Sequence, residues 1–498
     1  MSKLTLIPAL IALLALTACG TGNGTIGGFG GGGTSGGFTN ANLKGNYAYQ
    51  IVGTDLTTGT VVPFRESGVF VADGNGNVTA GEDDLAEGTT VLSSQVVPTM
   101  GGTAYSVSND GTAVLTLNFA DGGGVQIALS VVSSPSVYLV VNELLVPSGL
   151  RTVNGTGVIV AQTTAGFTVP SGPFVFRMQN VNTLGTGTAA VGAITVTGGN
   201  IAGNEDQNST GSDSQLTLTG AFNAPDTLGR GTGSFTDSNN VTSPFFYYVV
   251  DSGHFHLFAD STGGNIGTGR VVAQTGTALS GSYVFGSDDN YELGGVNRVG
   301  QFSAANGNIS GGTFDAVVGG TPTLGGTFGA SAYSSTGSGR FVVNLTPAGG
   351  TALQEICWVV NPSLIFFISN DANQEAGTAT LQQGNSFSKS SVNGTFGFSM
   401  DGFVINSNNT ISLLDYTGNA HWDGAGNTQL TAFQNVDGSG APSGTLNGTY
   451  TVMSNGRVAG NVSNLSSNLI LYLASGSDGY MLLGDTGVQI NGYMGQLP

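Results

Sequence analysis

The chain has 498 residues, of which 84 are glycine, and only 8% are Asp, Glu, Lys or Arg, against roughly 25% in an ordinary soluble domain. Thirty acidic residues face eleven basic ones, which gives a formal net charge of −19. This balance argues against a nucleic-acid-binding protein, because phosphate recognition requires a basic patch. The 26 Phe and 14 Tyr residues argue against intrinsic disorder, which goes with few aromatic residues and many charges.

The first twenty residues indicate export followed by lipidation. A basic start at Lys3 precedes an apolar run that is shorter than the about 20 residues needed to span a bilayer. The run ends in Leu16-Thr17-Ala18-Cys19, which resembles the lipobox of bacterial lipoproteins. The resemblance implies cleavage before Cys19, attachment of fatty acyl chains, palmitate among them, and sorting to the outer membrane, which Gly20 favours. We therefore expect a signal peptide over residues 1–18, with an ordinary, non-lipidated signal peptide as the alternative.

Residues 19–41 are expected to form the lipidated cysteine and a Gly-rich flexible tether, whose composition gives a reach of about 25 Å. Once Cys19 is modified, Cys357 is the one cysteine left, so no intrachain disulfide is expected. Cys357 stands in an apolar stretch without a neighbouring histidine, which predicts a buried and unreactive thiol.

Three landmarks recur four times in the same order. A strand opener with two aromatic residues two positions apart comes first, then a hairpin turn rich in Asn-Gly or Asp-Gly, then a closing strand with Gln162, Gln274 or Gln382 at its end and a looser fourth version that reaches Gln496. The opener aromatics are Tyr47 and Tyr49, Phe174 and Phe176, Tyr283 and Phe285, and Phe396 and Phe398. Because residues two apart on a strand share a face, each pair points to one side of its sheet. We expect four β repeats, over residues 42–163, 164–276, 277–385 and 386–498.

Short apolar runs bounded by Gly, Asn, Asp and Ser fill each repeat, and no stretch shows a capped helical period. The sequence therefore predicts an all-β protein of four tandem units, each with about eight antiparallel strands. An up-and-down β-barrel is favoured over a Greek-key sandwich, because closure removes exposed strand edges. The opener also resembles the Gly-x-Trp opener of lipocalin-like (calycin) barrels, with Tyr or Phe in place of Trp. A membrane-spanning barrel is less favoured, since the apolar runs are shorter than about 9–11 residues.

Acidic residues recur just beyond the hairpin turns. Asp73-x-Asn75-x-Asn77 is interpreted as a hairpin turn, because a calcium loop of this pattern would need flanking helices. The acidic residues that follow are interpreted as solvated loop charges that keep the surface soluble, with calcium chelation as the alternative. They are Glu82, Asp83, Asp84, Glu205, Asp206 and Asp315.

No residue pattern indicates an enzyme. His254 and His256 share one strand face, but His421 belongs to another repeat, so we expect exposed strand positions and no metal site. The Gly-rich strings lack both the strand-to-helix order of a nucleophile elbow and the lysine and helix of a phosphate loop. We therefore expect no catalytic residue and no cofactor.

Three arginines follow a glycine at about the same place in their repeats, at Arg230, Arg340 and Arg457, whereas the first repeat has Gly111-Thr112. The hypothesis is that each arginine covers one end of its unit, either by stacking on an opener aromatic or by pairing with a carboxylate. An exposed arginine at a strand end is the alternative.

Together these patterns predict a non-catalytic, lipid-anchored protein of the cell envelope, exposed at the surface or facing the periplasm. Its expected partners are the membrane, through the lipid anchor, and a surface glycan or envelope protein, with a role in binding, adhesion or scaffolding. A carrier of a small apolar ligand is the alternative, since an eight-stranded barrel can enclose one molecule or be filled by its own side chains. Filling by the opener aromatics is expected.

Overall fold

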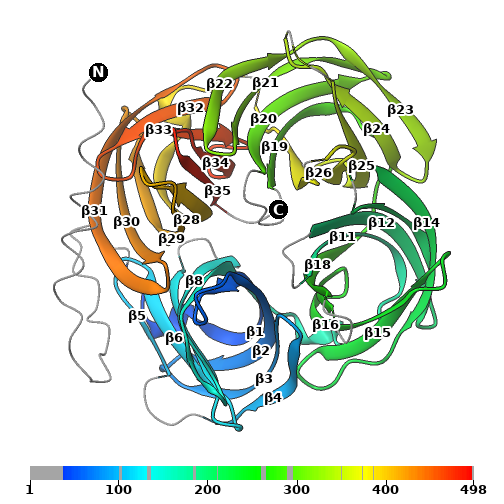
Figure 1. Cartoon of the computed structure of the whole chain (residues 1–498), viewed down its shortest axis with the longest axis vertical. Coiled ribbons are helices and arrows are strands. Elements are labelled where there is room, and N and C mark those ends of the chain that lie inside the picture. The colour runs from blue at the N-terminus through cyan, green and yellow to red at the C-terminus, as the bar shows by residue number, and fades with distance from the viewer. Residues whose placement is uncertain are drawn as a thin grey trace. The chain divides into compact units, whose positions relative to one another are not determined.

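The computed structural model describes residues 37–99, 104–131, 136–182, 187–209, 211–259, 265–288, 295–348, 350, 352–372, 374–384 and 386–495. The chain divides into the units Met1–Gly30 and Gly31–Pro498, and the described residues all belong to the second. They form four antiparallel sheets in chain order, here called modules 1 to 4 (Figure 1). The predicted all-β class with four tandem units is confirmed. In this part of the chain no helix is long and apolar enough to cross a bilayer.

Module 1 is a ten-stranded sheet in the order β4-β3-β2-β1-β10-β8-β7-β6-β5, with β9 paired to β8. The short 3-10 helix η1 (Asn40–Asn42) precedes it. Its strands are β1 (Lys44–Asp55), β2 (Val62–Asp73), β3 (Val78–Glu87), β4 (Thr90–Val97), β5 (Tyr105–Val107), β6 (Thr112–Asn118), β7 (Gly124–Ser130), β8 (Ser136–Val146), β9 (Gly149–Arg151) and β10 (Val153–Ala161). The first strand, β1, pairs with the last, β10.

Modules 2 and 4 are closed barrels of eight strands in sequence order, which confirms the predicted up-and-down barrel. After η2 (Thr164–Gly166), module 2 comprises β11 (Gly172–Asn182), β12 (Gly187–Thr197), β13 (Asn200–Asn208), β14 (Asp213–Phe222), β15 (Arg230–Asp237), β16 (Thr242–Asp251), β17 (His254–Ala259) and β18 (Asn265–Ala273). After η3 (Lys389–Ser391), module 4 comprises β28 (Asn393–Ile405), β29 (Ile411–Asp423), β30 (Asn427–Val436), β31 (Ser439–Val452), β32 (Arg457–Val462), β33 (Ser466–Leu473), β34 (Gly479–Leu483) and β35 (Val488–Met494). The strands reach 14 residues in β31, longer than the apolar runs indicated, because the ladders continue through Gly, Ser, Thr and Asn.

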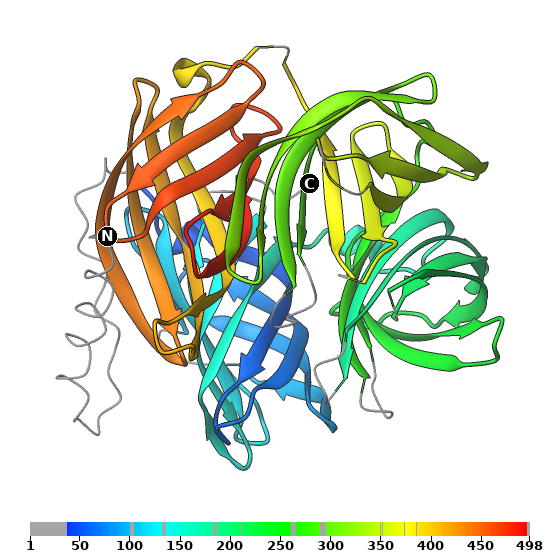
Figure 2. The same cartoon turned by 45° about the horizontal axis from the view of Figure 1, so that its top comes forward.

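Module 3 has nine strands in the order β20-β19-β27-β26-β25-β24-β23-β21-β22, and β20 also pairs with β21. The strands are β19 (Gly281–Asp288), β20 (Val296–Ala305), β21 (Asn308–Val318), β22 (Thr321–Phe328), β23 (Ser331–Gly337), β24 (Arg340–Leu345), β25 (Leu353–Asn361), β26 (Leu364–Ser369) and β27 (Ala376–Leu381). Because β21 bonds to both β20 and β23, eight strands complete a circuit and β22 extends from it. Each sheet curves around its own interior (Figure 2).

The opener aromatics point into the interior of their own modules. Seven of the eight are at most 5% exposed, and Phe396 is half-buried against the core of module 4. They contact further aromatic rings, such as Phe176 with Phe235 at 5.5 Å between ring centroids and Tyr283 with Phe302 at 5.7 Å. The cavity beside Phe285 inside module 3 measures about 10 Å³, which is space for about one water molecule and too little for an apolar ligand.

The opposite faces of several strands are buried as well. Every residue of β26 and of β34 is buried, which explains why their sequences are almost entirely apolar. Outward-facing side chains form one apolar cluster between modules 1 and 2, one between modules 2 and 3, and one between modules 3 and 4 that also includes Tyr138 of module 1. Consecutive modules therefore pack on each other through apolar surfaces.

Candidate functional site at the contacts between modules

The three Gly-Arg pairs place one arginine at each contact between consecutive modules. Each arginine begins a strand, after a glycine with a φ of 86° to 90°, a left-handed conformation that suits glycine. A tyrosine or tryptophan lies directly opposite on the neighbouring strand, and both side chains hydrogen-bond to an aspartate of the preceding module. We call each set an inter-module triad: Asp84–Arg230–Tyr248, Asp206–Arg340–Trp358 and Asp315–Arg457–Tyr472.

The triad between modules 2 and 3 shows the geometry most fully. Arg340 Nε and Nη2 donate to Asp206 Oδ1 at 2.9 and 2.6 Å, and Nη2 also donates to Asp213 Oδ2 at 3.0 Å. Trp358 Nε1 donates to Asp206 Oδ2 at 2.6 Å. Asp206 is 0% exposed and Arg340 only 7%. Burial lowers the pKa of Arg340, but the hydrogen bonds and charge of Asp206 outweigh this and raise it.

The other two triads repeat this arrangement. Arg230 Nε and Nη2 bond to the two oxygens of Asp84 at 2.7 and 2.8 Å, and its guanidinium lies 4.1 Å from the ring centroid of Phe246. Arg457 Nε and Nη2 bond to the two oxygens of Asp315 at 2.7 and 2.6 Å. Bidentate charge-assisted bonds of this kind hold their partners in one orientation.

The interpretation of the recurring acids as solvated loop charges was wrong for the triad aspartates. Asp84, Asp206 and Asp315 lie on β3, β13 and β21 and are 0% exposed, as is Asp83, which points into module 1. The reason is that the outward face of these strands is covered by the next module. The triad aspartates recur in repeats 1 to 3 and the Gly-Arg pairs in repeats 2 to 4, which was a usable signal, but the sequence did not show that each aspartate meets the arginine of the next module.

A glutamine directly after the last strand of modules 1, 2 and 3 bonds to the next module beside each triad. Gln274 Nε2 donates to the backbone oxygens of Ser338 and Val359 in module 3, at 3.1 and 2.9 Å. Gln162 and Gln382 make the equivalent pairs of bonds to modules 2 and 4. The fourth version, Gln496, lies outside the described residues. These contacts attach the connection between two modules to the second of them.

The contact between modules 4 and 1 has a different chemistry. Among the described residues, the strand register places Phe433 at the aspartate position, Thr112 at the arginine position and Ser130 opposite Thr112. Asparagines make the side-chain hydrogen bonds at this contact. Ser130 Oγ donates to Asn419 Oδ1 at 2.5 Å, and Asn435 Nδ2 donates to the backbone oxygens of Val141 and Val153 at 2.7 and 2.8 Å. All three triad positions are thus replaced together at this one contact.

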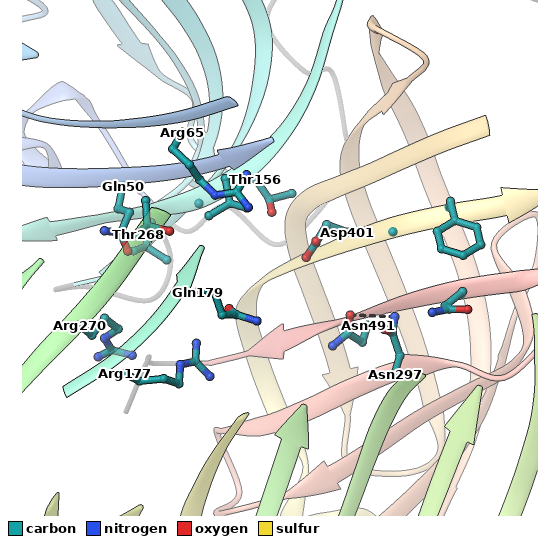
Figure 3. A pocket seen from close by; sticks show the side chains of 16 residues that line it. Gln50, Arg65, Thr156, Arg177, Gln179, Thr268, Arg270, Asn297, Asp401 and Asn491 are labelled. Carbon is teal, nitrogen blue, oxygen red and sulfur yellow. Dashed lines mark hydrogen bonds between the residues drawn. The ribbon is translucent and has the colours of Figure 1, made fainter. Parts of the chain in front are cut away.

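A cavity of about 240 Å³ lies where the four modules meet, lined by residues of each, most of which have polar or charged side chains (Figure 3). We call it the junction cavity; it adjoins a second pocket of about 220 Å³ with which it shares Arg177, Arg270 and Asp401. The two pockets together are lined by the residue that follows the second opener aromatic on the first strand of each module: Gln50 and Arg177 line the junction cavity, and Gly286 and Ser399 line the second pocket. Their partners on the last strands also line these pockets: Val158, Arg270, Thr378 and Tyr493. The sequence did not indicate this site, because the four equivalent positions differ in residue type.

The remaining candidates for chemistry do not come together. The expectation of exposed histidines was wrong for His256, which is 0% exposed and whose pKa is lowered to about 3 by burial and by Arg270; His254 is half-buried. No group of three or more His, Cys, Asp or Glu among the described residues could hold a metal ion. Cys357 is 3% exposed and burial raises its pKa, so the predicted buried thiol is confirmed.

The predicted hairpin turn at Asp73 is also confirmed. Asp73 Oδ1 accepts the backbone N–H groups of Asn75 and Asn77 at 2.7 and 3.1 Å. Asn77 Nδ2 donates to Asp73 Oδ2 at 2.7 Å. These hydrogen bonds to the ionised carboxylate lower the pKa of Asp73 to about 2. The side chains therefore stabilise the turn itself.

No family model and no curated protein matches the chain. Among solved structures, a double mutant of the vaccine antigen transferrin-binding protein B from Haemophilus parasuis Hp5 is similar, with a TM-score of 0.18 and 11% identity over 73% of this chain and 83% of that one. A single mutant of the same antigen matches over the same shares with 10% identity and a TM-score of 0.18. Intact Ap-TbpB, with its N and C lobes, matches over 72% of this chain and 83% of its own, with 9% identity and a TM-score of 0.18. This degree of likeness does not place the chain in a family.

Proposed function

We propose that the protein is a non-catalytic, lipid-anchored component of the cell envelope in which four β modules act as one rigid binding or scaffold unit. The observation that carries the proposal is the buried inter-module triad, which recurs at three consecutive contacts. Three repeats of one bidentate contact fix the spacing of the exposed loops, and loops on a fixed frame suit recognition of a glycan or an envelope protein.

The anchor is supported by the sequence Leu16-Thr17-Ala18-Cys19, although Cys19 lies outside the described residues. The signal peptide over 1–18, the tether over 19–41, and the repeat boundaries 42–163, 164–276, 277–385 and 386–498 stay predictions. Several acyl chains, each CH₂ contributing about 0.8 kcal/mol, would hold the protein at the outer membrane.

The packing of the modules favours this role over an apolar carrier. The opener aromatics occupy the interiors, and the space beside Phe285 in module 3 is about 10 Å³. The buried carboxylates Asp84, Asp206 and Asp315 are engaged by arginines, and such pairing suits a structural role.

Rigidity is tested by spin labels at Thr58→Cys and Asn239→Cys, two exposed turn positions in modules 1 and 2. We expect a single narrow distance distribution in pulsed electron paramagnetic resonance, because Arg230 holds Asp84 across this contact. The same labels in Arg230→Ala should give a broader distribution. A broad distribution in the otherwise unchanged protein would contradict a rigid unit.

Anchoring is tested in cells with Cys19→Ser. We expect the unchanged chain to incorporate labelled palmitate and to fractionate with the outer membrane, and the variant to lose both properties. Incorporation that persists in Cys19→Ser would refute lipidation at this residue. Protease treatment of intact cells then separates the two locations: digestion of the protein supports surface binding, and full protection supports a periplasmic scaffold.

A further inference from the structure

We propose that the junction cavity binds a small hydroxylated anion, with Arg177 and Arg270 holding its carboxylate or phosphate group. The inference deepens the proposed binding function and rests on it, because the cavity is lined by residues of all four modules and requires their fixed contacts. The ligand is defined by its chemistry: one anionic oxygen group on a body that carries hydroxyl groups.

Basic residues are concentrated at the junction cavity. The chain has only eleven basic residues and a net charge of −19, yet three of the basic residues, Arg65, Arg177 and Arg270, line this one cavity. Asp401 is the one acidic residue among its described lining residues. A cluster of positive charge inside an acidic protein is a local site for an anion.

Two of these arginines face each other across a pair of strands. Arg177 on β11 and Arg270 on β18 are directly opposite each other across an antiparallel pair, where like charges are destabilising. Both are half-buried and lie together on one side of the cavity (Figure 3). Burial and the charge of Arg177 lower the pKa of Arg270 to about 10. An oxyanion between the two guanidinium groups would offset this repulsion, and arginine pairs are well suited to carboxylate and phosphate.

The rest of the lining indicates the body of the ligand. Thr156, Thr268 and Gln179 face the cavity from modules 1 and 2, and Asn297 and Asn491 are joined by a hydrogen bond of 3.0 Å at its far side (Figure 3). Such groups pair with hydroxyls, and Asp401 can accept a hydroxyl hydrogen. The volume of about 240 Å³ is smaller than the about 300–1,000 Å³ typical of drug-sized ligands, so a ligand of monosaccharide size or less is expected.

Binding is measured by isothermal titration on the full chain purified in detergent, with four probes: glucuronate, glucose 6-phosphate, inorganic phosphate and glucose. We expect the two hydroxylated anions to bind, phosphate to bind more weakly, and glucose to give no heat. Preference for glucuronate or for glucose 6-phosphate distinguishes a carboxylate from a phosphate ligand. Absence of binding by both hydroxylated anions, or equal binding of glucose, would overturn the proposal.

The variants test whether the cavity is the place of binding. Arg177→Gln and Arg270→Gln should each weaken binding about ten- to a hundredfold, since each removes a charge-assisted hydrogen bond. Asp401→Asn should tighten inorganic phosphate, because it removes the one carboxylate that repels it. Arg151→Gln makes the same change of charge on β9, where Arg151 lies 3.3 Å from Glu87, and should bind like the unchanged protein.

Arg177→Gln is expected to weaken anion binding and Asp401→Asn to strengthen phosphate binding. A general loss of structure would instead weaken binding in both variants. Unchanged affinity in both arginine variants, or weaker phosphate binding in Asp401→Asn, would overturn the proposal. The spin-label distances distinguish the two levels of failure. A narrow distribution without anion binding refutes the ligand alone, whereas a broad distribution refutes the rigid unit on which the ligand site depends.

Discussion

Replacing Arg340 with alanine is expected to lower the free energy of unfolding by about 3–5 kcal/mol, the cost of removing one partner of a buried ion pair. The loss is large because Asp206 is 0% exposed. Without the guanidinium of Arg340, this buried carboxylate would lose its charged partner and retain the hydrogen bond from Trp358 Nε1. Trp358 also provides the measurement. In a Trp422→Phe background it is the one tryptophan of the chain, so denaturant unfolding followed by its fluorescence reports directly on this contact.

Arg151→Ala is the matched control. Arg151 approaches Asp55 and Glu87 at 3.6 and 3.3 Å, and its side chain is 23% exposed, so solvent screens these pairs and Arg151→Ala is expected to cost less than Arg340→Ala. The double variant Arg340→Met with Asp206→Leu should recover part of the loss, because it removes the unpaired charge at position 206, although Asp213 loses its arginine and Trp358 Nε1 loses its acceptor. Equal small effects of Arg340→Ala and Arg151→Ala would show that the triad does not stabilise the contact.

Replacing Glu66 with glutamine is expected to remove a fall in stability between about pH 4.5 and 8. Glu66 points into module 1 with Asp83, and both are 0% exposed. Burial raises the pKa of Glu66 from 4.5 to about 8, against a smaller lowering by a hydrogen bond with Asp83. Burial and the charge of Glu66 likewise raise the pKa of Asp83 well above its ordinary value.

The pH dependence of stability results from the difference in proton binding between the folded and the unfolded protein. Below pH 4.5 the carboxyl is protonated in both states, so its contribution to stability is fully present. As the pH rises, the unfolded chain releases the proton first while the folded protein retains it, and stability falls by up to about 1.4 kcal/mol per pH unit until the folded group ionises near pH 8. The difference in unfolding free energy between Glu66→Gln and the unchanged protein should therefore increase over this range in favour of the variant.

The measurement is a series of denaturant titrations followed by circular dichroism at pH 4.5, 6 and 8. Glu143→Gln, an exposed position on β8 of the same module, controls for the change in net charge and should follow the unchanged protein. A stability difference between Glu66→Gln and the unchanged protein that stays constant with pH would contradict the assigned protonation.

The strands and turns could be predicted because their determinants are local. Tyr47 and Tyr49 alternate with Ala48 along one strand, and Asp73 forms its turn with Asn75 and Asn77 within five residues. The four-fold recurrence of such patterns indicated four barrels, and modules 2 and 4 close as predicted. Module 1 differs from the predicted eight strands because it has ten, and its strand β9 forms an additional hairpin with β8. No spacing in the sequence indicated the hairpin of β8 and β9.

The candidate sites could be predicted only in part. Arg230, Arg340 and Arg457 stand out by their glycine and their recurrence, and pairing with a carboxylate was one of three interpretations, beside stacking on an opener aromatic and exposure at a strand end. The junction cavity depends on residues such as Arg177 and Arg270, which become neighbours because the first and last strands of a barrel pair. Closure of the predicted barrel implied that these two strands pair. It did not indicate that the other modules would pack around this strand pair and line a cavity beside it.

By itself the amino-acid sequence determined which residues form strands, which face of each first strand carries aromatic rings, and how often the unit repeats, because alternation and turn chemistry act over a few neighbouring residues. Only the tertiary structure decided what covers the other face. Asp84 in an outward strand position has the same local pattern whether it meets water or Arg230 of the next module, 146 residues further on. The contacts that join the modules, and the cavity they enclose, therefore arise from packing between segments too distant for any local pattern to relate.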